Sequence, residues 1–260
     1  MKILPIKMAI VTTYIGFLYA IPASASPQIF NPEQEARIGQ IAADYLVAHP
    51  EVLVSVSQRL QQQQKQREQM SFAVSVMENQ ATLLNDAATP VYGPDNAQVA
   101  VIEFFDYQCT YCIAMAPELQ KVMKTHPEVR YVFKEWPIFS GSRENSLLAA
   151  QRGLAVWKEK GAEAYVTYHN AVLAAGRDSG AVTKENIEEA AVKAGWQEKE
   201  KTDFRDVIAG NEKLARTLGL SGTPGIIVMP TKAAMPNNIT VFPGKVSAEM
   251  LEKAIRKAGD

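Results

Sequence analysis

The feature that most constrains the fold of this chain is an apolar strand followed directly by its only two cysteines. Residues Val99 to Phe105 form a near-continuous apolar run, which is typical of a strand buried on both faces of a sheet. Cys109 and Cys112 come next, and residues 113–124 carry apolar side chains at helical spacing. The cysteine pair is therefore expected where a buried strand ends and a helix begins.

The spacing of the two cysteines favours chemistry over cross-linking. Closing so short a loop removes little entropy from the unfolded chain, so a disulfide here would stabilise the fold poorly. The same spacing suits a pair that cycles between dithiol and disulfide. Structural zinc or copper binding and an inert pair are the alternatives. A closed zinc site needs four ligands, however, and the three histidines (His49, His126 and His169) lie far from the pair in sequence. We expect neither a metal nor a cofactor.

The first 25 residues have the pattern of a secretory signal peptide. Lys2 and Lys7 precede the apolar run 8–21, and small residues at 23–25 provide a cleavage site. A membrane anchor is the alternative, but a run of 14 residues is shorter than the roughly 20 that a spanning helix needs. We expect cleavage after residue 25 and a periplasmic location, which is an oxidising compartment suited to reactive thiols. Nothing in the charge pattern suggests a nucleic-acid partner.

Residues 31–85 are predicted to be helical without a core of their own. Asn31 is a helix N-cap and Pro32 suits the first helical position. Two apolar stripes follow at helical spacing, separated by His49-Pro50, because proline disfavours helix at the residue before it. The stripes are Ile38, Ile41, Ala42, Tyr45 and Leu46, then Val52, Leu53, Val56 and Leu60.

The almost wholly polar tract Gln61–Gln69 separates these stripes from the rest of the chain. Packing of the helices on their own catalytic domain is one interpretation. We favour an oligomerisation stalk over residues 31–60 with a Gln-rich connector that could be flexible. A helix with an exposed apolar face usually buries that face against another chain.

The remaining pattern predicts an α/β domain. Residues 129–133 form a second strand parallel to the first, and residues 226–229 and 239–242 form an antiparallel pair. A closing helix follows Ser247. Between the two pairs of strands lie four predicted helices, at 143–159, 162–174, 184–194 and 204–218, with glycines near their ends.

Disulfide exchange proceeds by thiolate attack, so the attacking sulfur needs a lowered pKa. Cys109, at the start of a helix, gains from the helix dipole and from free backbone N–H groups. Cys112 lies one turn inward, so we expect it to be less exposed and to resolve the mixed disulfide.

Three segments closely resemble the DsbA-like family of thiol–disulfide oxidoreductases: Glu103–Cys112, Val132–Ile138 and Leu218–Pro224. The resemblance covers about residues 90–258 and implies a thioredoxin fold with a helical domain inserted after the second strand. The N-terminal extension is similar to the stalk of the ScsC and BcfH type, whose members are trimers with disulfide isomerase activity. The expected domains are a signal peptide (1–25), a helical stalk and connector (26–70) and a DsbA-like domain (71–260) with its insertion at about 142–219.

The resemblance implies roles for individual residues. Cys109 is the nucleophile and Cys112 the resolving cysteine. Pro224 is the cis proline beside the active site, and the backbone of Thr223 would bond to a bound peptide. Glu103 matches the family's buried acid, which could relay a proton or form a structural ion pair with Lys134.

The residues between the cysteines depart from the strongest oxidases of the family. Those oxidases carry a histidine where this chain has Tyr111, and a phenol stabilises a thiolate far less than an imidazolium does. Thr110 replaces a proline or glycine, although its hydroxyl could bond to the Cys109 sulfur. We predict a Cys109 pKa below that of a free thiol but above that of the extreme oxidases. Asp106, nearby, is expected to be a turn or surface residue.

These features predict a periplasmic disulfide isomerase that acts on exported, cysteine-containing proteins. Several active sites around a common stalk, with a trimer favoured, would suit isomerisation and would hinder recharging by a membrane oxidase. A membrane redox partner would reset the dithiol. The alternatives are a dithiol oxidase of the same family, a copper-binding protein that uses both thiolates and Met115, and an assembly scaffold for secreted surface structures.

Overall fold

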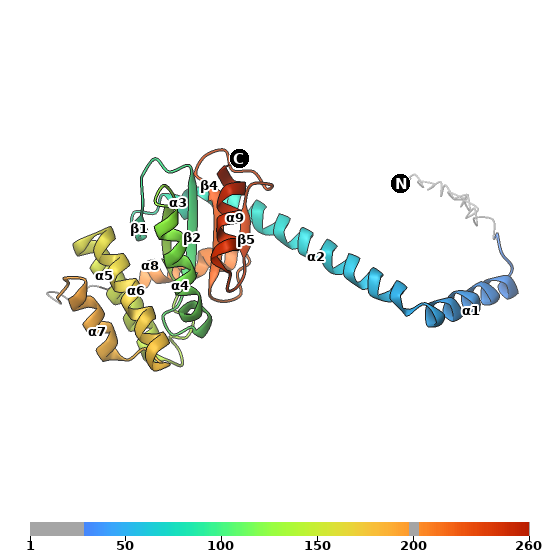
Figure 1. Ribbon diagram of the computed structural model, residues 1–260, viewed down its shortest axis with the longest axis horizontal. Coiled ribbons are helices and arrows are strands. Elements are labelled where there is room, and N and C mark those ends of the chain that lie inside the picture. The colour runs from blue at the N-terminus through green and yellow to red at the C-terminus, as the bar shows by residue number, and fades with distance from the viewer. Residues whose placement is uncertain (1–28, 198–202, 260) are drawn as a thin grey trace, which may run out of the picture. The chain divides into compact units, whose positions relative to one another are not determined.

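The computed structural model describes residues 29–197 and 203–259 (Figure 1). The expected signal peptide lies outside these residues. The chain divides into two compact units, one that ends at Arg59 and one that begins at Leu60. Within the described residues, no helix has the length and apolar character required to cross a bilayer.

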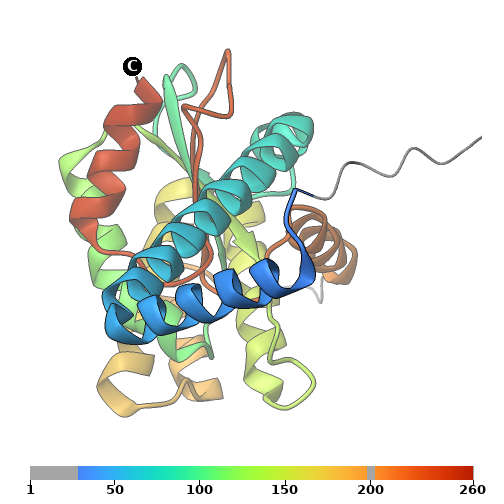
Figure 2. The same ribbon diagram turned by 90° about the vertical axis from the view of Figure 1, so that its right-hand side faces the viewer.

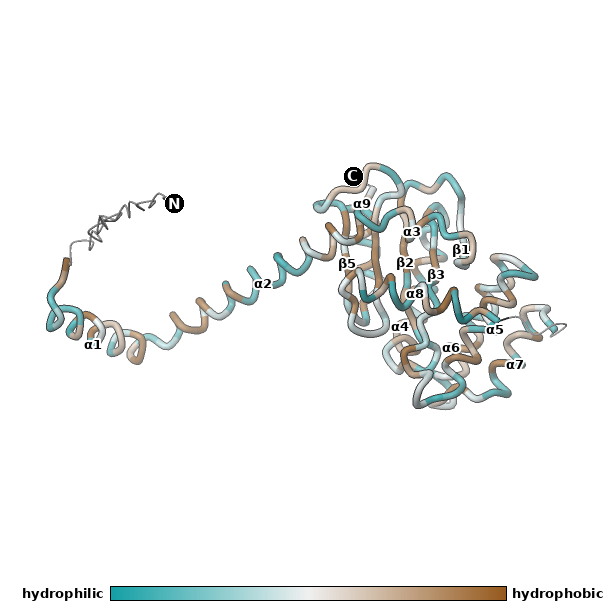
Figure 3. Tube along the Cα trace, turned by 180° about the vertical axis from the view of Figure 1, so that it is seen from behind, coloured by the Kyte–Doolittle hydropathy of each residue, from teal (hydrophilic) through white to brown (hydrophobic). Residues whose placement is uncertain are grey.

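The first unit contains helix α1 (Pro32–Ala48) and the start of helix α2 (Pro50–Glu78). A capping box starts α1, because the Asn31 side chain accepts from the Gln34 backbone N–H while the Gln34 side chain accepts from that of Asn31. The predicted break falls at His49-Pro50. None of the residues of α1 is buried, and Ile38, Ile41 and Tyr45 of its stripe are exposed. Figure 3 shows hydrophobic positions along α1.

Helix α2 runs without a break through the Gln61–Gln69 tract. The connector, which the sequence suggested could be flexible, is therefore regular helix in this structure. Its glutamine, lysine, arginine and glutamate residues all have good helix propensity. Burial begins at Phe72, where the helix reaches the core of the second unit.

The second unit is built on a five-stranded sheet with the strand order β1-β3-β2-β4-β5. Strands β2 and β3 are parallel and β4 and β5 are antiparallel, as the sequence predicted. Strand β4 is also antiparallel to β2, a pairing that the sequence did not predict. The short edge strand β1, antiparallel to β3, was not predicted because two residues cannot show a strand's alternating pattern. The strand bounds are Val91–Tyr92 (β1), Val99–Phe105 (β2), Arg130–Glu135 (β3), Gly225–Pro230 (β4) and Thr240–Phe242 (β5).

Helices cover both faces of this sheet. Helices α4 (Thr110–Thr125) and α9 (Ala248–Gly259) pack on one face. The end of α2, helix α3 (Gln80–Leu84) and helix α8 (Arg205–Thr217) cover the other. Figure 2 shows α9 and α8 on opposite sides of the sheet. Because side chains alternate along a strand, neighbouring residues of β2 enter different cores.

The helical insertion between β3 and β4 comprises α5 (Glu144–Lys160), α6 (Ala162–Ser179), α7 (Lys184–Lys193) and α8. Figure 1 shows α5, α6 and α7 gathered beside the sheet. Helix α6 is longer than predicted, because Gly176 does not end it. A Cβ at Gly176 would lie 2.8 Å from Ile113 Cδ1, so this glycine permits close packing on α4. The helix ends instead at Gly180, which is left-handed with φ 77°.

We predict that Phe72 anchors the end of α2 to the second unit. Phe72 is 7% exposed. Its ring packs so closely on Gly219 that a Cβ at that glycine would lie 3.2 Å from the ring. Phe72→Ala should lower the free energy of unfolding by about 3 kcal/mol or more in denaturant titration. Val74→Ala, a control in the same helix at a position 41% exposed, should have a far smaller effect. Equal losses in the two variants would contradict this anchoring.

Candidate active site

Cys109 occupies the N-cap of α4, one turn after β2 ends at Phe105. Its backbone is extended (φ −80°, ψ 117°), and its N–H donates to Asp106 O at 3.0 Å. This conformation aims the free N–H groups of the first helical turn at the cysteine side chain. The predicted position of the pair, between a buried strand and a helix start, is what the structure shows.

Asp106 fixes this turn. Its carboxylate accepts hydrogen bonds from the Gln108 N–H (2.8 Å), the Phe139 N–H (2.9 Å) and the Ser146 hydroxyl (2.7 Å). Of the two expected positions, a turn is confirmed, because Asp106 O accepts from the Cys109 N–H, and a surface position was wrong, because the residue is 1% exposed. Burial raises the pKa of Asp106, although the three hydrogen bonds oppose that rise. The carboxylate thus ties the cysteine turn to the segment after β3 and to α5.

The two cysteines are reduced and buried, and their pKa values are shifted in opposite directions. A hydrogen bond with Cys112 is the main cause that lowers the pKa of Cys109 to about 6, against the opposing effect of burial. The Thr223 side chain and the backbone N–H groups of Tyr111 and Cys112 lower it further. Burial raises the pKa of Cys112 well above its usual value. At neutral pH, Cys109 is therefore mainly a thiolate and Cys112 a thiol.

The loop between α8 and β4 brings Thr223 to the cysteines. The Thr223–Pro224 peptide bond is cis, and the Cys109 thiol, when protonated, donates to the Thr223 carbonyl oxygen at 3.2 Å. Tyr111, in contrast, is 66% exposed on the rim of the site. Thr110 is also exposed, and among the described hydrogen bonds none joins its hydroxyl to the Cys109 sulfur.

Glu103 lies on the cysteine side of the sheet but does not pair with Lys134. Glu103 on β2 is paired with Phe133 on β3, so these two side chains share one face of the sheet. Lys134 follows Phe133 on β3 and therefore points to the other face. There Lys134 Nζ contacts Asp86 Oδ2 at 3.0 Å and Thr89 Oγ1 at 2.6 Å. The suggested Glu103–Lys134 ion pair was therefore wrong. The side chain that approaches Glu103 is that of His169, whose Nε2 lies 3.6 Å from Glu103 Oε2.

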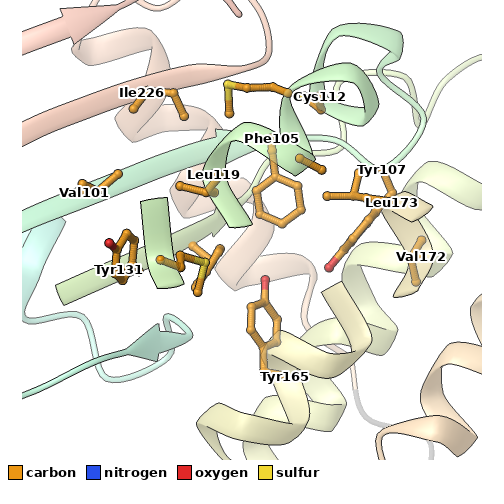
Figure 4. Close-up of a cluster of buried hydrophobic side chains, with 14 of the residues drawn as sticks. Val101, Phe105, Tyr107, Cys112, Leu119, Tyr131, Tyr165, Val172, Leu173 and Ile226 are labelled. Atoms are coloured by element: carbon orange, nitrogen blue, oxygen red, sulfur yellow. The ribbon is translucent and has the colours of Figure 1, made fainter. Parts of the chain in front are cut away.

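Sequence reasoning missed a second buried acid on this face, Glu135. Its Oε1 accepts hydrogen bonds from the hydroxyls of Tyr165 (2.7 Å) and Tyr107 (3.1 Å), which point toward the same region in Figure 4. Burial raises the pKa of Glu135 well above its usual value. The alternation of β3 was the available signal, since it places Glu135 on the same face as Phe133.

A cavity of about 700 Å³ lies beside the start of α4, toward the helical insertion. It gives the active-site rim a recess next to Thr110 that has both polar and apolar walls. Its lining includes Gln108, Thr110, Ile113, Arg143, Asn145 and Val182. Within residues 29–197 and 203–259, no cluster of three or more His, Cys, Asp or Glu side chains could hold a metal ion.

The Thr223 hydroxyl is buried and has no hydrogen-bond partner among the described residues, and we predict that it donates to the Cys109 sulfur once this is a thiolate. Thr223→Val removes this hydroxyl at nearly constant volume and should raise the pKa of Cys109 by about one unit, because a hydrogen bond to the anion is lost. Thr110→Val is the matched control, and its thiolate titration by ultraviolet absorbance should stay at about pH 6. A Thr223→Val curve that superimposes on that of the control would refute this role.

Comparison with known proteins agrees with this geometry. Residues 85–243 match the family model described as thioredoxin, and residues 34–67 match the copper resistance protein ScsC N-terminal domain. BcfH of Salmonella enterica Typhimurium is 34% identical, with a TM-score of 0.73 over 88% of this chain and 97% of that chain. No significant match is found among curated proteins.

Two further solved structures are similar. Proteus mirabilis ScsC in a transitional conformation is 27% identical, with a TM-score of 0.61 over 88% of this chain and 98% of that chain. A periplasmic thioredoxin-like protein from Salmonella enterica serovar Typhimurium is 28% identical, with a TM-score of 0.58 over 69% of this chain and 95% of that chain. The family and the fold class predicted from the sequence are confirmed. The chain therefore belongs to the thioredoxin-like family of thiol–disulfide oxidoreductases and carries an N-terminal domain of the ScsC type.

Proposed function

We propose that this chain is a periplasmic protein disulfide isomerase, with Cys109 as its nucleophile and Cys112 as its resolving cysteine. The observation that carries the proposal is the opposite shift of the two cysteine pKa values at the start of α4. A thiolate that exists at neutral pH attacks a disulfide, whereas a buried thiol waits for the second step.

The reaction begins when the Cys109 thiolate attacks one sulfur of a client disulfide. A mixed disulfide forms between Cys109 and the client, and the other client sulfur leaves as a thiolate. A different client thiolate can then attack the mixed disulfide, which releases Cys109 and leaves a rearranged client disulfide. Alternatively, Cys112 attacks Cys109, which releases the reduced client and leaves the Cys109–Cys112 disulfide.

The surroundings of Cys109 support a role on extended client segments. The Thr223 carbonyl oxygen lies within hydrogen-bond distance of the Cys109 sulfur, so a peptide bonded to the Thr223 backbone would place its cysteine against Cys109. Exposed Tyr111 offers an apolar contact on the rim. Pro224 follows Thr223 in this loop, which we propose as the client-docking edge of the site.

The moderate shift of Cys109 favours isomerisation over strong oxidation. The most oxidising CxxC proteins stabilise their thiolate to a pKa of about 3.5, whereas Cys109 has a pKa of about 6. A less stable thiolate makes the dithiol form less favoured and the protein a weaker oxidant. Tyr111, which is neutral where a histidine would carry charge, agrees with this balance.

The stalk, residues 31–60, supports oligomerisation. Helix α1 buries no residue, and most large apolar side chains of the two stripes are exposed, with 48–56% exposure at Ile38, Ile41, Leu53, Val56 and Leu60. Such faces are normally covered by another chain. We propose a homotrimer, which the likeness to the ScsC and BcfH type favours. A membrane redox partner would keep the dithiol reduced.

A periplasmic location is part of this proposal. One similar solved structure is described as a periplasmic thioredoxin-like protein, and residues 1–25 have the pattern of a cleaved signal peptide. The periplasm also supplies exported client proteins whose cysteines are oxidised.

We predict that isomerisation depends on the stalk. The double variant Ile41→Glu/Leu53→Glu places a negative charge in each apolar stripe, so that the stripes of neighbouring chains should repel one another. The molecular mass measured by light scattering should then fall to that of one chain. Refolding of scrambled ribonuclease should fall at least about tenfold, because linked active sites raise the effective concentration of thiolates. Oxidation of a dithiol peptide should persist in this variant and be lost in Cys109→Ser.

The matched control is Gln58→Glu with Gln62→Glu. It adds the same charge on the opposite face of α2 and should leave both the mass and the isomerase activity unchanged. A monomeric stalk variant with full isomerase activity would contradict the proposed role of oligomerisation. Full activity in Cys109→Ser would contradict the proposed chemistry.

A further inference from the structure

His169, from the helical insertion, is buried against the acid that lies on the cysteine side of the sheet. It sits in the middle of α6, and its side chain and that of Glu103 are each 2% exposed. The 3.6 Å between Nε2 and Oε2 is ion-pair distance, although it is long for a hydrogen bond. The ring is held between Phe105 and Phe133, whose centroids lie 4.8 and 4.9 Å from its own.

His169 is the group placed to balance the charge of Glu103. Neither carboxylate oxygen of Glu103, nor His169 Nε2, has a hydrogen-bond partner among the described residues. Lys134, which the sequence suggested as the partner of Glu103, instead forms an ion pair with Asp86 on the other face of the sheet. A buried carboxylate without a counter-charge is costly and tends to take up a proton.

The other titratable groups around the pair are already engaged. The Tyr107 and Tyr165 hydroxyls donate to Glu135, and the Tyr168 hydroxyl donates to Ala149 O at 2.8 Å. Burial, together with the charges of Asp106 and Glu103, raises the pKa of Glu135 well above its usual value. The titratable groups that face the pair are Cys112 from α4, Tyr107 after β2, Glu135 from β3 and Tyr165 from α6.

Cys112 needs a proton acceptor when it acts. Burial raises its pKa well above its usual value, and the charge of Glu103 raises it further. A thiol in this state does not ionise by itself at neutral pH, so resolution of the mixed disulfide requires a nearby base. Glu103 provides that base only while it is a carboxylate.

We propose that His169 is a positioning residue that shares a proton with Glu103 and so keeps Glu103 able to take the Cys112 proton. This inference rests on the proposed roles of the two cysteines. In the resolving step, the Cys112 sulfur bonds to Cys109 and the bond from Cys109 to the client breaks. The client sulfur leaves with the electron pair as a thiolate. The Cys112 proton moves to Glu103 and is shared with His169, and it returns to Cys112 when the disulfide is reduced.

The test separates the two chemical steps in the full-length reduced protein. An aromatic disulfide reagent releases one coloured thiolate when Cys109 attacks and a second when Cys112 resolves the mixed disulfide. We expect His169→Gln to slow the second release about tenfold or more at neutral pH and to move its pH profile to higher pH. The first release should be unchanged. Glu103→Gln should slow the same phase, and the double variant should be no slower than Glu103→Gln alone.

The matched control is Tyr168→Phe, which alters the adjacent buried residue of α6 without touching the pair and should leave both phases unchanged. Equal slowing of both phases, an unaffected second phase in His169→Gln, or effects that multiply in the double variant would each overturn the inference. A wild-type protein without a fast first phase would instead refute the proposed role of Cys109.

A measurement on the wild-type protein keeps the test decisive if His169→Gln does not fold. The chain has three histidines, so the imidazole nitrogen NMR signals of His169 can be assigned. Proton sharing predicts that these signals differ between the reduced and oxidised protein near neutral pH. Identical signals in both redox states from pH 5 to pH 9 would overturn the inference.

Discussion

The hydrogen bond between the two cysteine sulfurs is the interaction on which this site depends. It is the largest cause that lowers the pKa of Cys109, and it also raises that of Cys112. One contact therefore divides the pair into an attacking thiolate and a waiting thiol. It forms because α4 starts directly after β2, which places residues three apart on the same first turn. Thr223 completes the site from a distant part of the chain.

The cysteine side of the sheet also holds three buried acids, each accommodated differently. Asp106 accepts three hydrogen bonds that fix the turn before Cys109. Glu135 accepts hydrogen bonds from two tyrosine hydroxyls, and burial raises its pKa well above its usual value. Glu103 has no hydrogen-bond donor among the described residues, and its Oε2 lies 3.6 Å from the imidazole Nε2 of His169. Glu103 is therefore the acid that we propose to take part in proton exchange.

Much of this architecture could be predicted from local sequence. Apolar runs gave the strands, and helical spacing gave the helices to within a few residues, because both patterns record burial. Gly176 made the predicted helix 162–174 too short, because this glycine allows close packing on α4 and does not end α6. The partners of Glu103 and Lys134 could not be read from the sequence without the register, which separates adjacent residues onto opposite faces. His169 is even less predictable, because only the folded insertion brings α6 over β2.

The account is tested most directly by alkylation of the reduced protein as a function of pH, with each modified cysteine located by mass spectrometry. We expect modification at Cys109 alone, with a half-maximal rate at about pH 6. Cys112 should remain unmodified at neutral pH because its pKa is raised and its side chain is buried. Equal modification of both cysteines, with half-maximal rates near the free-thiol value of about 8.5, would contradict the account.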